Sequence, residues 1–128
     1  MRAKLFLLFA FLWAVQASAH EPSKSYLSLT LDTNGITGQW DIPLRDLRAV
    51  VPLGANNTSP VTWDELRAGY RAITAYAAAH LKIKSASQSG ALRFTNAEPT
   101  VENFSDGPYI ELPLVVEGLG RPATLEVD

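Results

Sequence analysis

Apolar and polar residues alternate in the first part of the chain that follows residue 24. Leucines occupy alternate positions within 25–31, which is the two-residue period of a half-buried strand. A second strand is expected over 36–42, where Ile36, Trp40 and Ile42 share one face. Asn34-Gly35 lies between the two runs, and this dipeptide favours a type I′ turn because both residues tolerate positive φ. The pattern therefore predicts an antiparallel hairpin.

The spacing of apolar residues changes to three and four after Pro43. A short helix is expected over 44–51, ended by Pro52, with its buried face formed by Leu44, Leu47, Val50 and Val51. A longer helix should begin at Thr62, because Thr62 and Glu65 have the spacing of a capping box. Its predicted buried stripe is Leu66, Tyr70, Ile73, Ala77 and Leu81.

The last third of the chain returns to strand-like runs separated by turn residues, over 91–95, 109–116 and 123–127. The segments 85–90 and 103–108 are expected to be loops. Pro113 has no N–H group, so its strand should be an edge strand or carry a bulge at that point. The predicted fold is α+β, a mainly antiparallel sheet or sandwich with an inserted helix–loop–helix.

Residues 1–19 have the tripartite pattern of a signal peptide. A basic start is followed by an apolar run over 5–15 and by small residues at Ala17 and Ala19. The apolar run is shorter than the roughly 20 residues needed to span a bilayer. Cleavage is expected between Ala19 and His20, leaving one exported, extracytoplasmic domain over 20–128 with no further membrane span.

Composition restricts the function of the predicted mature domain. Without the leader, nine basic residues stand against 13 acidic ones, so the net charge is near −4. This balance does not favour binding to nucleic acid or anionic lipid. The chain has no cysteine, which excludes thiol catalysis and thiolate metal sites.

The segment 54–65 has the register of a 12-residue EF-hand loop. Asn56 falls at loop position 3 and Glu65 at position 12, between two predicted helices. Position 1 is Gly54 instead of aspartate, and position 6 is Ser59 where glycine normally makes the turn. The number of carboxylate ligands largely determines Ca²⁺ affinity. We therefore favour an empty loop, in which Glu65 serves the capping box, over a calcium site.

Three segments carry a family resemblance: His20-Glu21-Pro22-Ser23-Lys24-Ser25-Tyr26-Leu27, Gly38-Gln39-Trp40-Asp41-Ile42-Pro43-Leu44-Arg45-Asp46-Leu47 and Val61-Thr62-Trp63-Asp64-Glu65-Leu66. They resemble the exported N-terminal domain of HupE/UreJ-type membrane proteins, which are linked with nickel uptake. The resemblance implies a noncatalytic domain whose partner is its own transmembrane region or another membrane protein. It also implies a periplasmic or extracytoplasmic location, with the full-length form tethered to the membrane. Members of that family continue into transmembrane helices, so we expect this chain to be a fragment or a truncated reading frame.

The two histidines suggest an alternative function. After cleavage, the α-amine and imidazole of His20 could chelate Cu²⁺ or Ni²⁺, with His80 as a second imidazole ligand. The alternative is thus a free periplasmic metal-binding module that uses His20, or the loop residues Asn56 and Glu65. A helix-terminal histidine is more often a cation facing the helix dipole than a ligand.

Nothing in the sequence predicts an enzyme. The chain has no Gly-x-Ser-x-Gly motif, no phosphate-binding glycine loop and no nucleophile paired with a base at a recognisable spacing. Trp40 and Trp63 are expected in the core. The leading hypothesis is therefore a noncatalytic exported domain.

Overall fold

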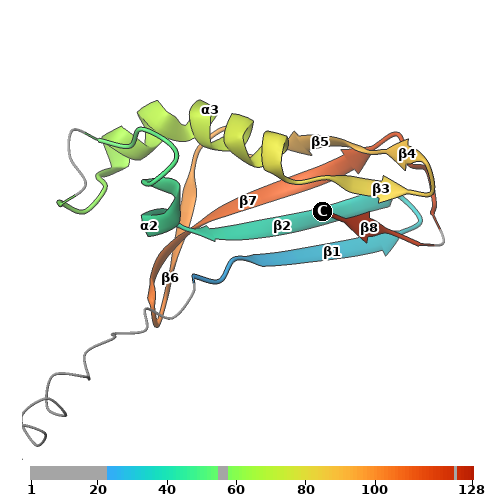
Figure 1. Cartoon of the computed structure of the whole chain (residues 1–128), viewed down its shortest axis with the longest axis horizontal. Helices are drawn as coiled ribbons and strands as arrows, with labels where there is room; N and C mark the ends of the chain where they lie inside the picture. Colours follow the sequence, from blue (N-terminus) through green and yellow to red (C-terminus); the bar gives the residue numbers. More distant parts are fainter. Residues whose placement is uncertain (1–22, 55–57, 123) are drawn as a thin grey trace, which may run out of the picture.

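The computed structural model describes residues 23–54, 58–122 and 124–128, so the predicted leader and its cleavage site lie outside the described residues. These residues form an α+β fold dominated by antiparallel strands (Figure 1). The helices are α2 (Leu44–Leu47) and α3 (Trp63–His80). The strands are β1 (Tyr26–Asp32), β2 (Gly35–Pro43), β3 (Ile83–Ser85), β4 (Gln88–Ser89), β5 (Ala91–Phe94), β6 (Thr100–Phe104), β7 (Gly107–Glu117) and β8 (Glu126–Val127).

A five-stranded sheet forms the centre of the molecule. Its order is β1-β2-β7-β5, and β6 pairs with β7 beside β5. The pairing of β2 with β7 is continuous from Ile36 opposite Val116 to Pro43 opposite Tyr109. A second, smaller sheet has the order β4-β3-β8. None of the helices in the described ranges has the length and apolar character required to span a membrane.

Pro113 lies in the central strand, so the prediction of an edge strand was wrong. The carbonyl of Pro113 accepts a hydrogen bond from the Thr95 N–H at 2.9 Å. The nitrogen and carbonyl of one residue in an antiparallel strand face the same neighbour, so the nitrogen of Pro113 also faces away from β2. On that side the partner of β7 changes from β5 to β6. The segment 95–99, which joins these two strands, does not pair regularly with β7. The missing N–H therefore falls where regular pairing is already interrupted.

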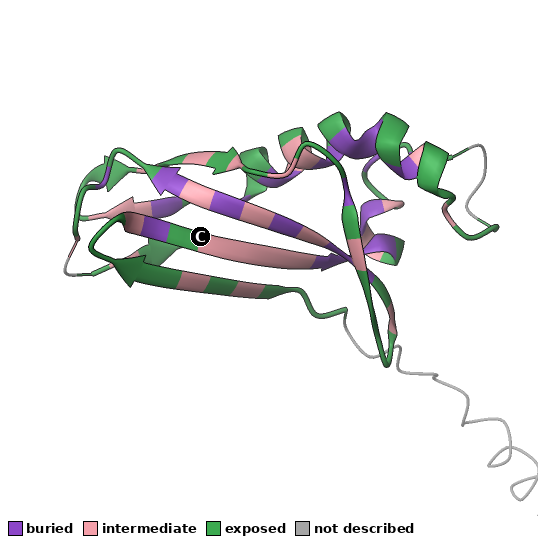
Figure 2. Ribbon diagram, turned by 180° about the vertical axis from the view of Figure 1, so that it is seen from behind, coloured by how far each residue is buried: buried purple, intermediate pink, exposed green. Residues whose placement is uncertain are grey.

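The hydrophobic core lies on one face of the large sheet. Figure 2 shows that buried positions alternate along β7, that β2 is buried near its two ends, and that α3 buries one stripe. The predicted stripe of α3 is confirmed: Leu66, Tyr70, Ile73, Ala77 and Leu81 are all buried. Two groups of buried residues, one under α3 and one under β3, are joined by Trp40 and Phe94, which pack against both. One continuous core therefore links the sheet, α3 and the smaller sheet.

The first hairpin is confirmed, but its turn differs from the predicted type. Asp32 pairs with Gly35, which places Thr33 and Asn34 in the loop. Gly35 has φ +129°, whereas Asn34 does not have positive φ. The Asp32 carboxylate accepts a hydrogen bond from the Asn34 N–H at 2.7 Å, and this contact organises the turn in place of a type I′ geometry.

Three further expectations need correction. The first helix ends at Leu47, and a hydrogen-bonded turn carries the chain to a buried Val51 while Val50 is 52% exposed. The segment 85–90 contains most of the β3–β4 hairpin, and 103–108 contains the tip of the β6–β7 hairpin. Short polar strands of this kind lack the alternation that identifies a half-buried strand.

Candidate functional site

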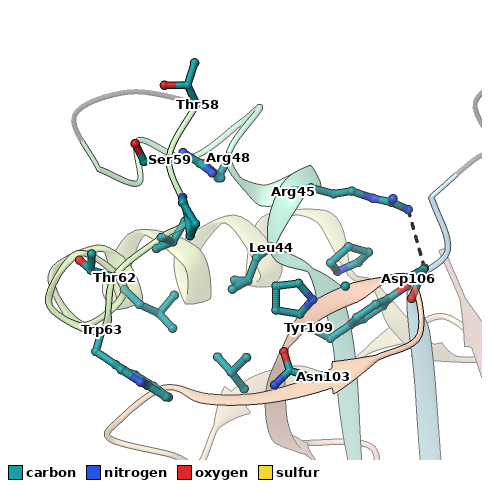
Figure 3. A pocket seen from close by; sticks show the side chains of 17 residues that line it. Leu44, Arg45, Arg48, Thr58, Ser59, Thr62, Trp63, Asn103, Asp106 and Tyr109 are labelled. Atoms are coloured by element: carbon teal, nitrogen blue, oxygen red, sulfur yellow. Dashed lines mark hydrogen bonds and ion pairs between the residues drawn. The ribbon is translucent and has the colours of Figure 1, made fainter.

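A cavity of about 580 Å³ opens where β2 ends, between α2, the segment 58–63 and the β6–β7 hairpin (Figure 3). Pro43 leads directly from β2 into α2, which positions α2 at the end of the sheet. The apolar part of the cavity lining consists of Leu44, Val61, Leu66, Val101 and Pro108, among others. A volume of this size lies within the range typical of ligand pockets.

The charged residues of the lining are two arginines and one aspartate. Arg45 and Arg48 come from the α2 turn, and Asp106 comes from the tip of the β6–β7 hairpin. The Arg45 Nη2 atom lies 3.8 Å from Asp106 Oδ2, and 53% of the Arg45 side-chain surface is exposed. The described lining therefore carries one net positive charge, in contrast to the acidic chain as a whole.

Tyr109 forms part of the same wall. Its side chain is buried, and its hydroxyl lies 2.7 Å from Asp106 Oδ2 and 3.1 Å from the Lys24 carbonyl oxygen. A hydroxyl has one proton to donate, and the shorter contact is with the carboxylate. Tyr109 thus joins the hairpin tip to the chain that enters β1, and it packs edge-on against Phe104 at 4.6 Å between ring centres.

These contacts predict a pH dependence of stability. The hydrogen bond to Asp106, then burial and the Asp106 charge, raise the pKa of Tyr109 to about 12 from an ordinary value of 10.0. The unfolded chain loses this proton near pH 10 while the folded chain keeps it, so the contribution is present below pH 10 and is lost as the pH rises through about 12. Urea unfolding between pH 9 and 12 should show this loss, and ultraviolet titration should show a tyrosine that ionises near pH 12.

Asp106→Asn should lower the pKa of that tyrosine, because it removes both the acceptor carboxylate and its charge. Tyr70→Phe is the matched control, since Tyr70 is buried on α3 and has no contact with Asp106 among those described. Burial also raises the pKa of Tyr70, so Tyr109→Phe is measured in a Tyr70→Phe background. An ionisation near pH 12 that persists in the double variant would contradict the assignment.

Trp63 is 54% exposed, so the prediction that it lies in the core was wrong. It is the first residue of α3, and it lines the cavity at its rim (Figure 3). Position 63 shares the helix face of Leu66 and Tyr70, but it is the first residue of α3 and lies beyond the buried end of the stripe. Trp40, by contrast, is partly buried and packs against both parts of the core, as expected.

Glu65 completes the capping box that the sequence predicted. The Glu65 N–H donates to Thr62 Oγ1 at 3.3 Å, and Glu65 Oε2 accepts from the Thr62 N–H at 2.9 Å and from Thr62 Oγ1 at 3.0 Å. Gly54 has φ +80°, and a Cβ placed there would lie 2.6 Å from Glu65 Oε1. The Glu65 carboxylate therefore lies against the backbone at both ends of the 54–65 segment.

The capping box gives a test of stability. Thr62→Ala should lower the free energy of unfolding by about 1 kcal/mol, because it removes the acceptor for the Glu65 N–H. Thr62→Ser keeps the hydroxyl and should retain most of the stability. Thermal or urea unfolding measures both, and equal losses in the two variants would contradict a capping role for the hydroxyl.

The other candidate metal ligands are widely separated or lie outside the described residues. His20 and Asn56 are not described. His80 is exposed at the last position of α3, with Nδ1 2.8 Å from the Tyr76 carbonyl oxygen and its ring stacked on Tyr76 at 4.0 Å. Fifteen residues of helix separate Glu65 from His80, about 22 Å. Within the described ranges, no three His, Cys, Asp or Glu residues are grouped as a metal site requires.

The cavity itself was missed by sequence reasoning. Arg45 and Asp106 are far apart in the sequence, and only the return of β7 alongside β2 brings them together. Trp63 and Arg45 each belonged to a quoted motif, but no spacing rule connects them. Comparisons of the chain with protein-family models, curated proteins and solved structures found no match.

Proposed function

We propose that the chain is a noncatalytic exported domain that binds a partner through the cavity beside α2. The proposal builds on the resemblance to the outer domain of HupE/UreJ-type proteins. The proposed partner is a membrane protein or a transmembrane region of the same protein. The observation that supports it is the cavity, which combines an apolar floor with Arg45, Arg48 and a half-exposed Trp63. Such a lining suits a segment that carries an apolar side chain next to a carboxylate.

Two features of the wall support recognition of a carboxylate. Arg45 lines the cavity and extends towards Asp106 (Figure 3), and its guanidinium can pair with a carboxylate through two parallel hydrogen bonds. Arg45 lies 3.7 Å from Asp46 Oδ1 and 3.8 Å from Asp106 Oδ2, and both distances are at the long end for an ion pair, so an incoming carboxylate can compete for Arg45. The apolar floor supplies affinity for an aromatic or aliphatic side chain.

The test uses two short probes that differ only in charge, N-acetyl-Phe-Asp-amide and N-acetyl-Phe-Asn-amide. Trp63 stands at the rim, so its fluorescence should change on binding. The Asp peptide should bind more tightly than the Asn peptide, and Arg45→Gln/Arg48→Gln should abolish the difference. Arg121→Gln is the control, because Arg121 is exposed and does not line the cavity. Equal binding of both peptides, or no binding, would overturn the proposal.

We further infer that the 54–65 segment is a degenerate EF-hand-like loop that needs no cation. Glu65, the single carboxylate at a ligand position of the loop, already accepts two hydrogen bonds from Thr62, and α2 supplies only four residues of flanking helix. Millimolar Ca²⁺ should therefore leave the unfolding temperature unchanged. A rise in that temperature with Ca²⁺ would contradict this inference.

The metal-binding alternative is distinguished by titration of Ni²⁺ and Cu²⁺ into protein that begins at an authentic His20. One residue added before His20 blocks chelation by the α-amine. Equal affinities in the two forms support the binding-domain proposal, whereas loss of affinity in the extended form supports the metal-binding module.

A further inference from the structure

The edge of the large sheet formed by β1 is open and regular. β1 pairs with β2 over all seven of its residues and has no other strand beside it among those described (Figure 1). The backbone N–H and C=O groups on its outer side can therefore pair with another strand. The opposite edge differs, because β5 and β6 are separated by 95–99 and Pro99 lies in the break.

β1 also lacks the features that usually prevent edge pairing. Natural edge strands are commonly protected by lysine, proline, a bulge or an inward-pointing charge. The strand Tyr-Leu-Ser-Leu-Thr-Leu-Asp has none of these within the strand, and its only charge is Asp32 at its end. Its register with β2 is unbroken. Leu31 is 46% exposed and Tyr26 is 47% exposed, so the edge also presents apolar surface.

We infer that β1 pairs with the β1 strand of a second copy of this chain, in antiparallel orientation about a two-fold axis at Leu29. This register places Leu27 opposite Leu31 on the core side of the sheet and Ser28 opposite Thr30 on the other side. Tyr26 then faces Asp32, and no like charges oppose each other. A two-fold interface requires a surface that is complementary to itself, and the residues of β1 meet this requirement in the register described.

Charges and burial outside the strand favour the same partner. The register places Lys24 of one copy diagonal to Asp32 of the other, and both side chains are exposed. Leu27 and Leu29 are only half-buried because β1 is the last strand over the core, as the alternating colours along β1 show (Figure 2). A second copy would extend the sheet and cover Leu31 together with these two residues. The site is separate from the cavity beside α2, so the inference does not depend on the proposed function.

The test introduces charges at Ser28 and Thr30, which are exposed, lie opposite each other across the inferred interface, and have the neutral neighbours Gln39 and Thr37 on β2. Sedimentation velocity over a concentration series should show twice the monomer mass for the full chain produced with its own leader. Ser28→Lys/Thr30→Lys places lysine against lysine at two points and should give a monomer. Ser28→Lys/Thr30→Glu places opposite charges there and should restore the dimer. Thr37→Lys, on β2 and away from the edge, is the control and should remain dimeric.

A single introduced cysteine gives an independent readout, since the chain has none of its own. Leu29→Cys lies on the inferred axis and should form an intermolecular disulfide under mild oxidation, whereas Thr37→Cys should not. Circular dichroism establishes that each variant is folded. A monomer at every concentration, or a dimer that persists in Ser28→Lys/Thr30→Lys, would overturn the inference.

Discussion

Replacing Ile73 by alanine should lower the free energy of unfolding by about 2–5 kcal/mol. Ile73 has no exposed surface and lies at the centre of the stripe by which α3 packs on the sheet. Its truncation leaves a cavity between α3 and the strands, and the surrounding side chains can relax only in part. The change is large compared with the 5–15 kcal/mol that typically stabilises a domain.

Urea unfolding followed by far-ultraviolet circular dichroism measures this effect. Arg71→Ala is the matched control on the same helix, because Arg71 is exposed and its truncation should change stability by less than about 0.5 kcal/mol. A loss below about 1 kcal/mol in Ile73→Ala would mean that α3 is not packed as described.

Replacing Gly38 by valine should lower the free energy of unfolding by about 3 kcal/mol, at the upper end of the usual cost of overpacking. A Cβ at this position would lie 2.5 Å from the Ser28 carbonyl oxygen and 2.7 Å from Leu29 Cδ2. The carbonyl belongs to the neighbouring strand and has no rotamer by which to move. β1 must therefore shift away from β2, which weakens the pairing between them.

The control for Gly38 is Thr37→Val, the adjacent position on the exposed face of the same strand. Valine is well suited to a strand, so this variant should retain its stability within about 0.5 kcal/mol. Equal stability of the two variants would contradict the close approach of β1 and β2 at Gly38.

Both predictions concern elements that were expected from the sequence. The stripe on α3 recurs every three or four residues, and the capping box marks where the helix begins. The hairpin of β1 and β2 follows from alternation on both sides of Asn34-Gly35. These signals are local, because they depend on residues within a few positions of each other.

The predictions that were wrong depended on packing between distant segments. Trp63 was expected in the core, but it is the first residue of α3 and is exposed beyond the end of the buried stripe. Pro113 was expected at an edge or at a bulge, and it is tolerated in the central strand because the side of the ladder away from β2 is interrupted at 95–99. Neither outcome is visible without the tertiary structure.

The sequence by itself determined the α+β class, the first hairpin, the start of α3 and the stripe that it buries. Only the tertiary structure decided the order of the strands, the central place of β7 and the cavity lined by Arg45, Asp106 and Trp63. The physical reason is that backbone propensity and hydrophobic periodicity depend on residues within a few positions of each other along the chain. The pairing of β2 with β7, by contrast, joins residues about 70 positions apart and depends on how the whole core packs.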